Sequence, residues 1–366
     1  MKIVVRNSCH GIALIIVMVS ILVLAALAGG FAYSMKVETK LARNATYETE
    51  LEWLGRSGVE YARWGLAEQL KIGAEPYDGL NQKWAGGPGG VGTSNSPLAD
   101  ISLYEPVTLG NGKFTITEIT DCERKFNINL ADQFILDRAL VSMGVDAGDT
   151  AGIVGSILDW IDRDNMTHLS GTESDYYQGF NPPYVAKNGP IDDLSEMLLI
   201  KGVTPEVFWG PACTNHSLAA FQAKSGRFGF GFQTQPVSYP AGLMDIFAPL
   251  SSGRVNLNTA SAETLQLIPG VDNNVAQAIV GARVEGYVQD GSVGGPFLNV
   301  APNYLWSRVP GLGLEVARQI QRYCDVRSKT FEVHVEAEVS GYKRQFIAIL
   351  GRNNPRDVQV LSFYWR

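Results

Sequence analysis

Five carboxylates lie within 17 consecutive residues near the middle of the chain, and no other part of the sequence offers so clear a set of ligands. They are Asp159, Asp162, Asp164, Glu173 and Asp175. Carboxylates this close repel one another unless a cation lies among them, and Ca²⁺ takes about six to eight oxygen ligands from loops of this kind. The pattern therefore predicts a calcium site, with a solvated acidic surface as the alternative.

Other chemistry is poorly supported. The carboxylates do not have EF-hand spacing, because no Glu falls at the end of an Asp-x-Asp-x-Asp-Gly loop. Zinc is disfavoured, since neither Cys nor His has ligand spacing here and His168 stands alone. The sequence contains no Gly-x-Ser-x-Gly elbow, no phosphate-binding Gly-Lys-Ser/Thr loop and no His-Glu-x-x-His motif. We predict that the protein is not an enzyme.

The acidic cluster falls inside a long segment with few strand signals, residues 126–330, which reads mostly as short helices. Strand-like runs rich in β-branched residues flank this segment, at 113–120 on one side and at 331–339, 344–350 and 358–365 on the other. The predicted fold class is α+β, in which a helix packs on an antiparallel sheet and a large helical domain is inserted into that sheet.

The inserted segment contains a repeat. Asn127-Ile128-Asn129 and Asn256-Leu257-Asn258 each open a helix pattern that leads to a glycine hairpin and a second helix, and shorter relatives end near Gly202 and Gly311. The unit is a helix-hairpin-helix. Such units can present backbone amides to DNA phosphates, so a membrane-anchored DNA-uptake protein is the rival hypothesis.

Charge argues against that rival. Between residues 254 and 327 six Arg are matched by six Asp and Glu, and the whole chain has a formal net charge of −7. Because nucleic-acid affinity depends on Lys and Arg near the phosphates, we expect no nucleic-acid binding and predict a structural helical scaffold.

The N-terminus reads as a membrane segment. A short basic leader with Lys2 and Arg6 ends at Gly11, and an uncharged run follows over residues 12–35. As a helix this run spans the roughly 30 Å core of a bilayer, and an amphipathic pattern continues without proline through residues 36–72. We predict one long helix, with cleavage between Gly11 and Ile12. A secretory signal closed by small residues near Gly30 is the alternative.

These features resemble the type IV pilin-like proteins, and most closely the K-type minor pseudopilins of type II secretion systems. The similarity is carried by residues 35–43 and 50–60 of the helix, the acidic loop, the Asn-Leu-Asn segment and the C-terminal strands. The resemblance implies removal of the leader by prepilin peptidase, methylation of the new amine at Ile12, and calcium in the acidic loop. It also implies a single-pass protein of the bacterial inner membrane with its head in the periplasm.

The same resemblance implies a place and partners in the secretion system. The protein would take part in export across the outer membrane as a minor pseudopilin at the tip of the pseudopilus. It would form a tip complex with other minor pseudopilins above the major pseudopilin, and could meet exported proteins and the outer-membrane secretin. Most pilins carry Glu at the fifth mature position, where this chain has Ile16. That residue is expected of a tip subunit, or is simply another apolar membrane residue.

Of the four cysteines, Cys9 lies in the leader. In an oxidising periplasm Cys122 and Cys324 are the favoured disulfide pair, because both lie where the chain passes between the strands and the helical segment. Three buried reduced thiols are the alternative.

The predicted organisation is a leader at 1–11, a transmembrane half-helix at 12–35, an amphipathic half-helix at 36–72, a loop with the first strands at 73–125, the inserted helical domain at 126–330, and C-terminal strands at 331–366.

Overall fold

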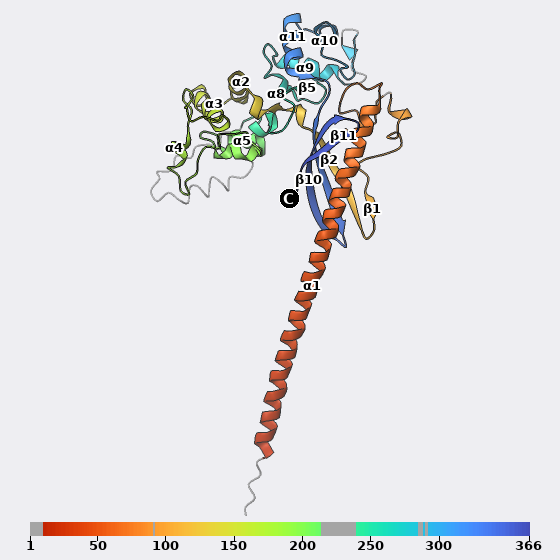
Figure 1. Ribbon diagram of the computed structural model, residues 1–366, viewed down its shortest axis with the longest axis vertical. Helices are drawn as coiled ribbons and strands as arrows, with labels where there is room; N and C mark the ends of the chain where they lie inside the picture. Colours follow the sequence, from red (N-terminus) through yellow and green to blue (C-terminus); the bar gives the residue numbers. More distant parts are fainter. Residues whose placement is uncertain (1–9, 91, 214–238, 285–287, 290–291) are drawn as a thin grey trace, which may run out of the picture.

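The computed structural model describes residues 10–90, 92–213, 239–284, 288–289 and 292–366. A single long helix, α1 (His10–Lys71), leads into a head made of a five-stranded sheet and a set of inserted helices (Figure 1). The α+β fold class predicted from the sequence is confirmed. The leader residues Lys2, Arg6 and Cys9 lie outside the described residues.

The two halves of α1 have different surroundings. From residue 13 to residue 46 every side chain is exposed, whereas Leu51, Leu54, Ala62 and Leu66 are buried against the sheet. The exposed half is long and apolar enough to cross a membrane. Figure 1 shows it projecting from the head with no other segment beside it.

The sheet is antiparallel throughout and has the strand order β1-β2-β9-β10-β11. Its strands are β1 (Val107–Leu109), β2 (Gly112–Asp121), β9 (Thr330–Val339), β10 (Tyr342–Asn354) and β11 (Asp357–Trp365). Period-2 burial along β9 produces the apolar face on which α1 lies. Two glycines of α1 permit the close approach: a Cβ at Gly58 would lie 2.5 Å from Val335 Cγ1, and one at Gly55 would lie 2.4 Å from Phe346 Cδ2.

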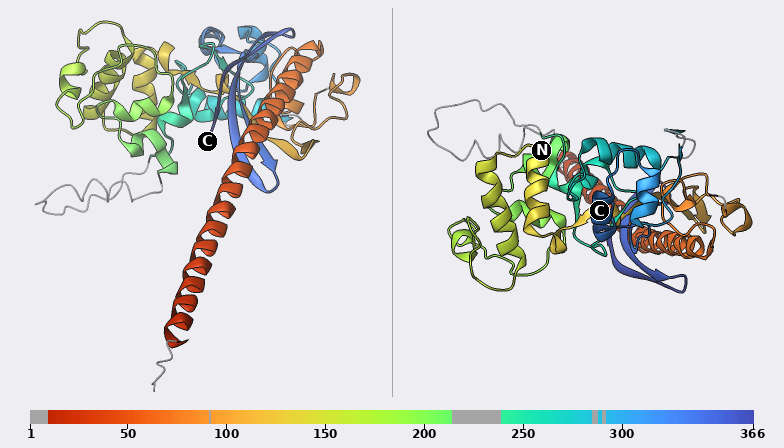
Figure 2. Two further views of the ribbon diagram at one scale, coloured as in Figure 1. Left: turned by 60° about the horizontal axis from the view of Figure 1, so that its bottom comes forward. Right: turned by 90° about the horizontal axis from the view of Figure 1, so that it is seen from above.

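The chain leaves this sheet at the end of β2 and returns to it at β9, more than two hundred residues later. The inserted α-helices are α2 (Gln133–Met143), α3 (Ala147–Ile161), α4 (Ser174–Tyr177), α5 (Pro205–Trp209), α7 (Leu243–Ile246), α8 (Ala262–Leu265), α9 (Asn273–Ala282), α10 (Pro302–Arg308) and α11 (Leu314–Tyr323). Figure 2 shows them extending sideways from the sheet, at the end of the head far from the N-terminal half of α1.

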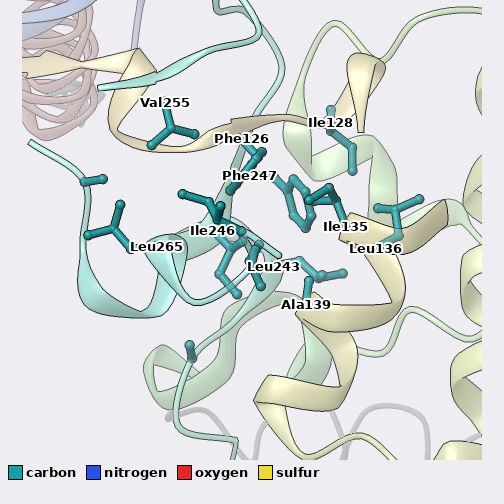
Figure 3. Close-up of a cluster of buried hydrophobic side chains, with 14 of the residues drawn as sticks. Phe126, Ile128, Ile135, Leu136, Ala139, Leu243, Ile246, Phe247, Val255 and Leu265 are labelled. Atoms are coloured by element: carbon teal, nitrogen blue, oxygen red, sulfur yellow. The ribbon is translucent and has the colours of Figure 1, made fainter. Parts of the chain in front are cut away.

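Short strands complete the insertion. They are β3 (Phe126–Asn127) parallel to β4 (Phe247–Ala248), β5 (Val255–Asn256) parallel to β8 (Cys324–Asp325), and β6 (Val288–Gln289) antiparallel to β7 (Ser292–Val293). One apolar core runs through α2, α3, α7 and the helices beyond. Figure 3 shows where β3 and β4 bring Phe126 and Phe247 together beside Ile135 and Leu136 of α2.

The predicted repeat is visible in the hydrogen bonds. Asn129 Oδ1 accepts from the amide of Ile191 at 2.7 Å, and Asn258 Oδ1 accepts from the amide of Phe297 at 2.7 Å. Each of these asparagines also has its own amide bonded to the side chain of the Asn two residues earlier, at 2.9 Å. Hairpin glycines with positive φ follow in each unit, including Gly144 and Gly270. The two Asn-x-Asn segments therefore make the same hydrogen bonds at the start of each unit.

A buried polar cluster joins the insertion to the head. Asp121 Oδ2, at the end of β2, accepts hydrogen bonds from Asn256 Nδ2 at 2.9 Å, Thr259 Oγ1 at 2.6 Å and Ser328 Oγ at 2.6 Å. Arg352 of β10 is fully buried beside it and pairs with Asp78. Segments far apart in the sequence are thus tied together at the point where the chain enters and leaves the insertion.

Candidate metal centre

The acidic residues predicted to hold a cation lie where α3 ends and the following loop turns back over it. Asp159 is in the last turn of α3, and Asp162 is the residue that closes the helix, with its amide bonded to Leu158 O. The loop then runs to Glu173, which directly precedes α4. Helix, loop and helix start thus bring carboxylates of different segments to one place.

Asp159 lies beneath this loop. Its side chain is 0% exposed, and Oδ1 accepts from the backbone amide of His168 at 2.8 Å and contacts His168 Nδ1 at 2.6 Å. The loop crosses closely, because a Cβ at Gly171 would lie 2.1 Å from Asp159 Oδ2. Only glycine fits at that position without moving the loop.

Two overlapping groups of side chains are close enough to share an ion. Asp162, Asp164 and Glu173 form an oxygen-only group, and Asp159, Asp162 and His168 form a second group, with the ligand atoms in each lying within 4.8 Å of one another. Asp175, the fifth predicted ligand, lies exposed in α4 and belongs to neither group. Four of the five predicted carboxylates therefore come together.

The electrostatics of these groups favour a cation. Burial, and after it the charges of Asp164 and Asp159, raise the pKa of Asp162, while His168 opposes the shift. Burial, followed by the charges of Asp159 and Asp162, raises the pKa of Glu173. Both Glu173 carboxylate oxygens are buried without a hydrogen-bond partner in the described structure. A bound cation would relieve the repulsion and supply the missing partner.

His168 corrects an expectation from the sequence. It is not alone: besides its contact with Asp159, its Nδ1 lies 3.5 Å from Asp162 Oδ2. The nine-residue separation from Asp159 matches no zinc motif, so ligand spacing could not reveal it. The available signal was its position inside an acidic loop that had to fold back on the helix before it.

The predicted disulfide is wrong. Cys122 and Cys324 are both free cysteines, as is Cys213. Cys324 is fully buried within the apolar core of the insertion, whereas Cys122 opens the short turn after β2. Burial raises the pKa of both thiols, which keeps them protonated and unreactive.

Gly11 and Ile12, the predicted processing site, lie in the first turns of α1, and Ile16 follows them on the exposed half with 59% of its surface accessible. They lie at the N-terminal end of α1, and Figure 1 shows this end of the helix remote from α3 and α4, which flank the acidic loop.

The arginines of the second helix-hairpin-helix region are occupied by the fold itself. Arg283 Nη1 donates to Leu257 O at 3.1 Å and Ala260 O at 2.6 Å. Arg308 Nη2 donates to Ala282 O at 3.2 Å and Gly295 O at 2.6 Å. These guanidinium groups therefore stabilise loops and helix ends of the scaffold.

Parts of this chain are similar in sequence to known proteins. Residues 112–209 match the family model for type II secretion system protein K, and residues 251–290 match a helix-hairpin-helix motif. Relatives named for that protein K include one of Escherichia coli strain K12, 24% identical over 56% of this chain and 61% of its own length, and one of Aeromonas hydrophila, 23% identical over 54% and 60%. The chain is thus similar to type II secretion system protein K, over residues 112–209 in the family model and over about half of its length in these relatives.

A solved structure shows the same fold. The crystal structure of a GspK-GspI-GspJ complex from enterotoxigenic Escherichia coli contains a chain that matches this one with a TM-score of 0.61 at 17% identity, covering 89% of this chain and 99% of that one. The alignments with the curated relatives span about three fifths of those proteins. These relatives are named as components of a secretion system and not as enzymes.

Proposed function

We propose that this chain is the minor pseudopilin at the tip of a type II secretion pseudopilus and takes part in protein export across the outer membrane. The observation that carries the proposal is the placement of the insertion. The inserted helices lie at the end of the head remote from the exposed half of α1 and spread sideways from the sheet (Figures 1 and 2). In a filament built by stacking α1 helices, this bulk would collide with a subunit placed above it, so a terminal position suits the chain.

The exposed half of α1 supports the same proposal. Its side chains from residue 13 to residue 46 are exposed and are largely apolar at the start, as expected of a helix stored in the inner membrane and later packed among other helices. Ile16 places no carboxylate in that apolar stretch. A subunit with no neighbour above it would have no N-terminal amine to neutralise such a charge.

The partners follow from this position. The GspK-like fold was solved in a complex with GspI and GspJ, and we propose that this chain forms the equivalent complex with I-type and J-type minor pseudopilins above the major pseudopilin. Exported proteins and the outer-membrane secretin are the proposed contacts of the tip. The head would lie in the periplasm.

We further propose that Asp162, Asp164 and Glu173 bind Ca²⁺. Oxygens that coordinate one Ca²⁺ at about 2.3–2.6 Å can lie no more than about 5 Å apart, and the ligand atoms of this group lie within 4.8 Å of one another. All three ligands are carboxylate oxygens, the donor type that Ca²⁺ prefers. The ion would hold the loop against the end of α3.

The helix-hairpin-helix match is the observation that favours the alternative, DNA binding. The hydrogen bonds speak against it, because Arg283 and Arg308 are engaged with backbone carbonyls and the hairpin amide of Val271 donates to Ile268 O at 3.0 Å. These groups are the ones that phosphates would need. A scaffold role for the motif is the better account.

Processing tests the pseudopilin proposal against this alternative. The full chain, produced together with prepilin peptidase and extracted from membranes, is expected to have the mass of a protein that begins at a methylated Ile12. Replacing Gly11 by a bulky residue should leave the leader attached. A mature N-terminus near Gly30 would contradict the proposal.

A further inference from the structure

Strand β11 forms a long, unpaired edge of the sheet. It pairs with β10 on one side and with no other strand of the described chain. The opposite edge strand, β1, is only three residues long, whereas β11 has nine residues. Residues 358–365 contain neither a charge nor a proline, and the bulge in β11 falls at Leu361, before the regular stretch 362–365. Shortness, charge and proline usually keep a sheet edge from pairing, and this stretch has none of them.

The register of β11 shows which of its backbone groups face outward. The amide of Arg366 donates to Gln345 O at 3.0 Å, so these two residues form a hydrogen-bonded pair. Hydrogen-bonded and non-hydrogen-bonded pairs alternate along an antiparallel ladder. Phe363 and Trp365 therefore turn their N–H and C=O groups away from β10. Within the part of the chain that the structure describes, these groups have no hydrogen-bond partner.

Exposed apolar side chains accompany these free backbone groups. Trp365 is 63% exposed and Tyr364 is 46% exposed. Phe363 lies on the face of the sheet that carries α1, since Arg56 Cζ of that helix lies 4.9 Å from the centre of the Phe363 ring. Successive side chains of a strand point to opposite faces, so Trp365 shares this face with Phe363. An incoming strand would contact these side chains as well as the outward backbone groups.

The free edge lies on the side of the sheet where the inserted helices lie. Figures 1 and 2 mark the C-terminal end of the chain, next to Trp365, on that side. Burial, and after it the charges of Glu332 and Asp193, raise the pKa of Tyr364. Asp193 belongs to the insertion, so part of the insertion lies near this edge. The exposed half of α1 is a separate surface, and a partner that packs along it need not cover β11.

We propose that the β11 edge binds an extended, uncharged segment of an exported protein, which adds to the sheet as a further strand beside Phe363 and Trp365. In strand addition the main-chain hydrogen bonds supply affinity, and they are the same for every sequence. One edge can therefore accept segments of unrelated proteins, which suits a tip that meets exported proteins of different sequence. The absence of charge from residue 358 to residue 365 favours a segment without charge, because a charge buried without a partner is costly.

The identity of the partner rests on the proposed function, whereas strand addition itself is tested separately. The test uses the full chain in detergent and a fluorescent peptide of about nine alternating Thr and Val residues with a polyethylene glycol tail for solubility. We expect saturable binding, with the amides of Phe363 and Trp365 exchanging their hydrogens at least about tenfold more slowly in the complex. The amide of Tyr364, which faces β10, should be unchanged. No saturable binding, or unchanged exchange at Phe363 and Trp365, would overturn the proposal.

Trp365→Pro and Trp365→Ala form a matched pair of variants. Both remove the exposed indole, but only proline also removes the outward N–H, and neither removes the N–H groups of Tyr364 and Arg366 that face β10. The peptide should bind about tenfold more weakly to Trp365→Pro than to Trp365→Ala, because a lost backbone hydrogen bond leaves an acceptor unpaired. Equal binding by the two variants would overturn the proposal. If Trp365→Pro fails to fold, hydrogen exchange in the unaltered chain still decides the question.

Crosslinking in secreting cells tests the source of the segment. A photoreactive phenylalanine analogue in place of Tyr364, in the same bacterium with its whole secretion system, should crosslink to proteins whose export depends on that system. Crosslinks only to other pseudopilins, or only to a second copy of this chain, would overturn the assignment to exported proteins. Failure of leader cleavage or of the tip complex would count against the proposed function and leave the peptide measurements unaffected.

Discussion

Replacing Arg352 by Met should strongly destabilise the head, because Arg352 is an ionised side chain held entirely inside the protein. Its side chain is 0% exposed and that of its partner Asp78 is 1% exposed. The guanidinium group also donates to Leu66 O at 3.2 Å and Ser328 O at 2.9 Å, and lies 4.5 Å above the Phe331 ring. It thus connects α1, the loop after it and the strand by which the chain returns to the sheet.

The magnitude follows from what the substitution leaves behind. Met fills much of the space, but Asp78 stays buried without its counter-ion, and breaking a buried pair in this way costs about 3–5 kcal/mol. Arg344→Met is the matched control on the same strand. Arg344 pairs with the exposed Glu48 at 3.1 Å, and a pair of that kind contributes about 0–1 kcal/mol.

The assay is guanidinium unfolding of the full chain in detergent, followed by circular dichroism with the denaturant slope checked for constancy. Adding Asp78→Asn to Arg352→Met should recover part of the lost free energy of unfolding, because the orphaned charge is then removed. If Arg352→Met loses no more stability than Arg344→Met, the buried pair does not hold the head and insertion together as described.

Three more predictions concern the proposed calcium loop, the buried polar cluster and DNA. Chelation should lower the melting temperature and expose residues 159–177 to protease, and Ca²⁺ at ten times its dissociation constant should restore about 1.4 kcal/mol of the free energy of unfolding while Mg²⁺ restores little. The double variant Asp162→Ala with Glu173→Ala should lose this response to Ca²⁺. Identical melting of the unaltered chain with chelator and with Ca²⁺ would rule the ion out. Burial, and next the charge of Glu123, raise the pKa of Asp121 from 3.8 to about 7. The folded state therefore keeps this proton longer than the unfolded chain does, and the stability that Asp121 contributes at low pH should be lost as the pH rises from 3.8 to about 7. Asp121→Asn should flatten the dependence of the free energy of unfolding on pH over this range, and an equally steep dependence in the variant would refute the raised pKa of Asp121. This chain should bind duplex DNA no better than an unrelated acidic protein does at physiological salt. Submicromolar, salt-sensitive binding that is lost in Arg318→Ala would instead favour a DNA-binding role.

Local patterns explain what the sequence could predict. The long helix α1 follows from an uninterrupted apolar and then amphipathic run, and β2 and β9 follow from alternating β-branched residues, since both patterns depend only on near neighbours along the chain. The hairpin glycines were readable for the same reason, because a left-handed residue at a helix end favours glycine.

Contacts between distant segments could not be predicted in this way. The cluster around Asp121 gathers Asn256 and Ser328 from positions more than a hundred residues away, and no periodicity encodes that meeting. The contact of His168 with Asp159 depends on how the loop folds back over α3. Gly171 leaves room for this close crossing, but a glycine in the sequence does not by itself predict it. The predicted disulfide is wrong for a related reason, because the positions of Cys122 and Cys324 along the chain do not determine whether their thiols meet in the folded protein.

The central claim, that this chain occupies the tip together with other minor pseudopilins, is tested most directly by native mass spectrometry. The full chain would be produced with prepilin peptidase and with the I-type and J-type minor pseudopilins of the same bacterium, then purified in detergent through a tag on the J-type protein. The account predicts a complex that contains the processed chain together with both partners. Recovery of the two partners without this chain, or of this chain only as a polymer of itself, would contradict it.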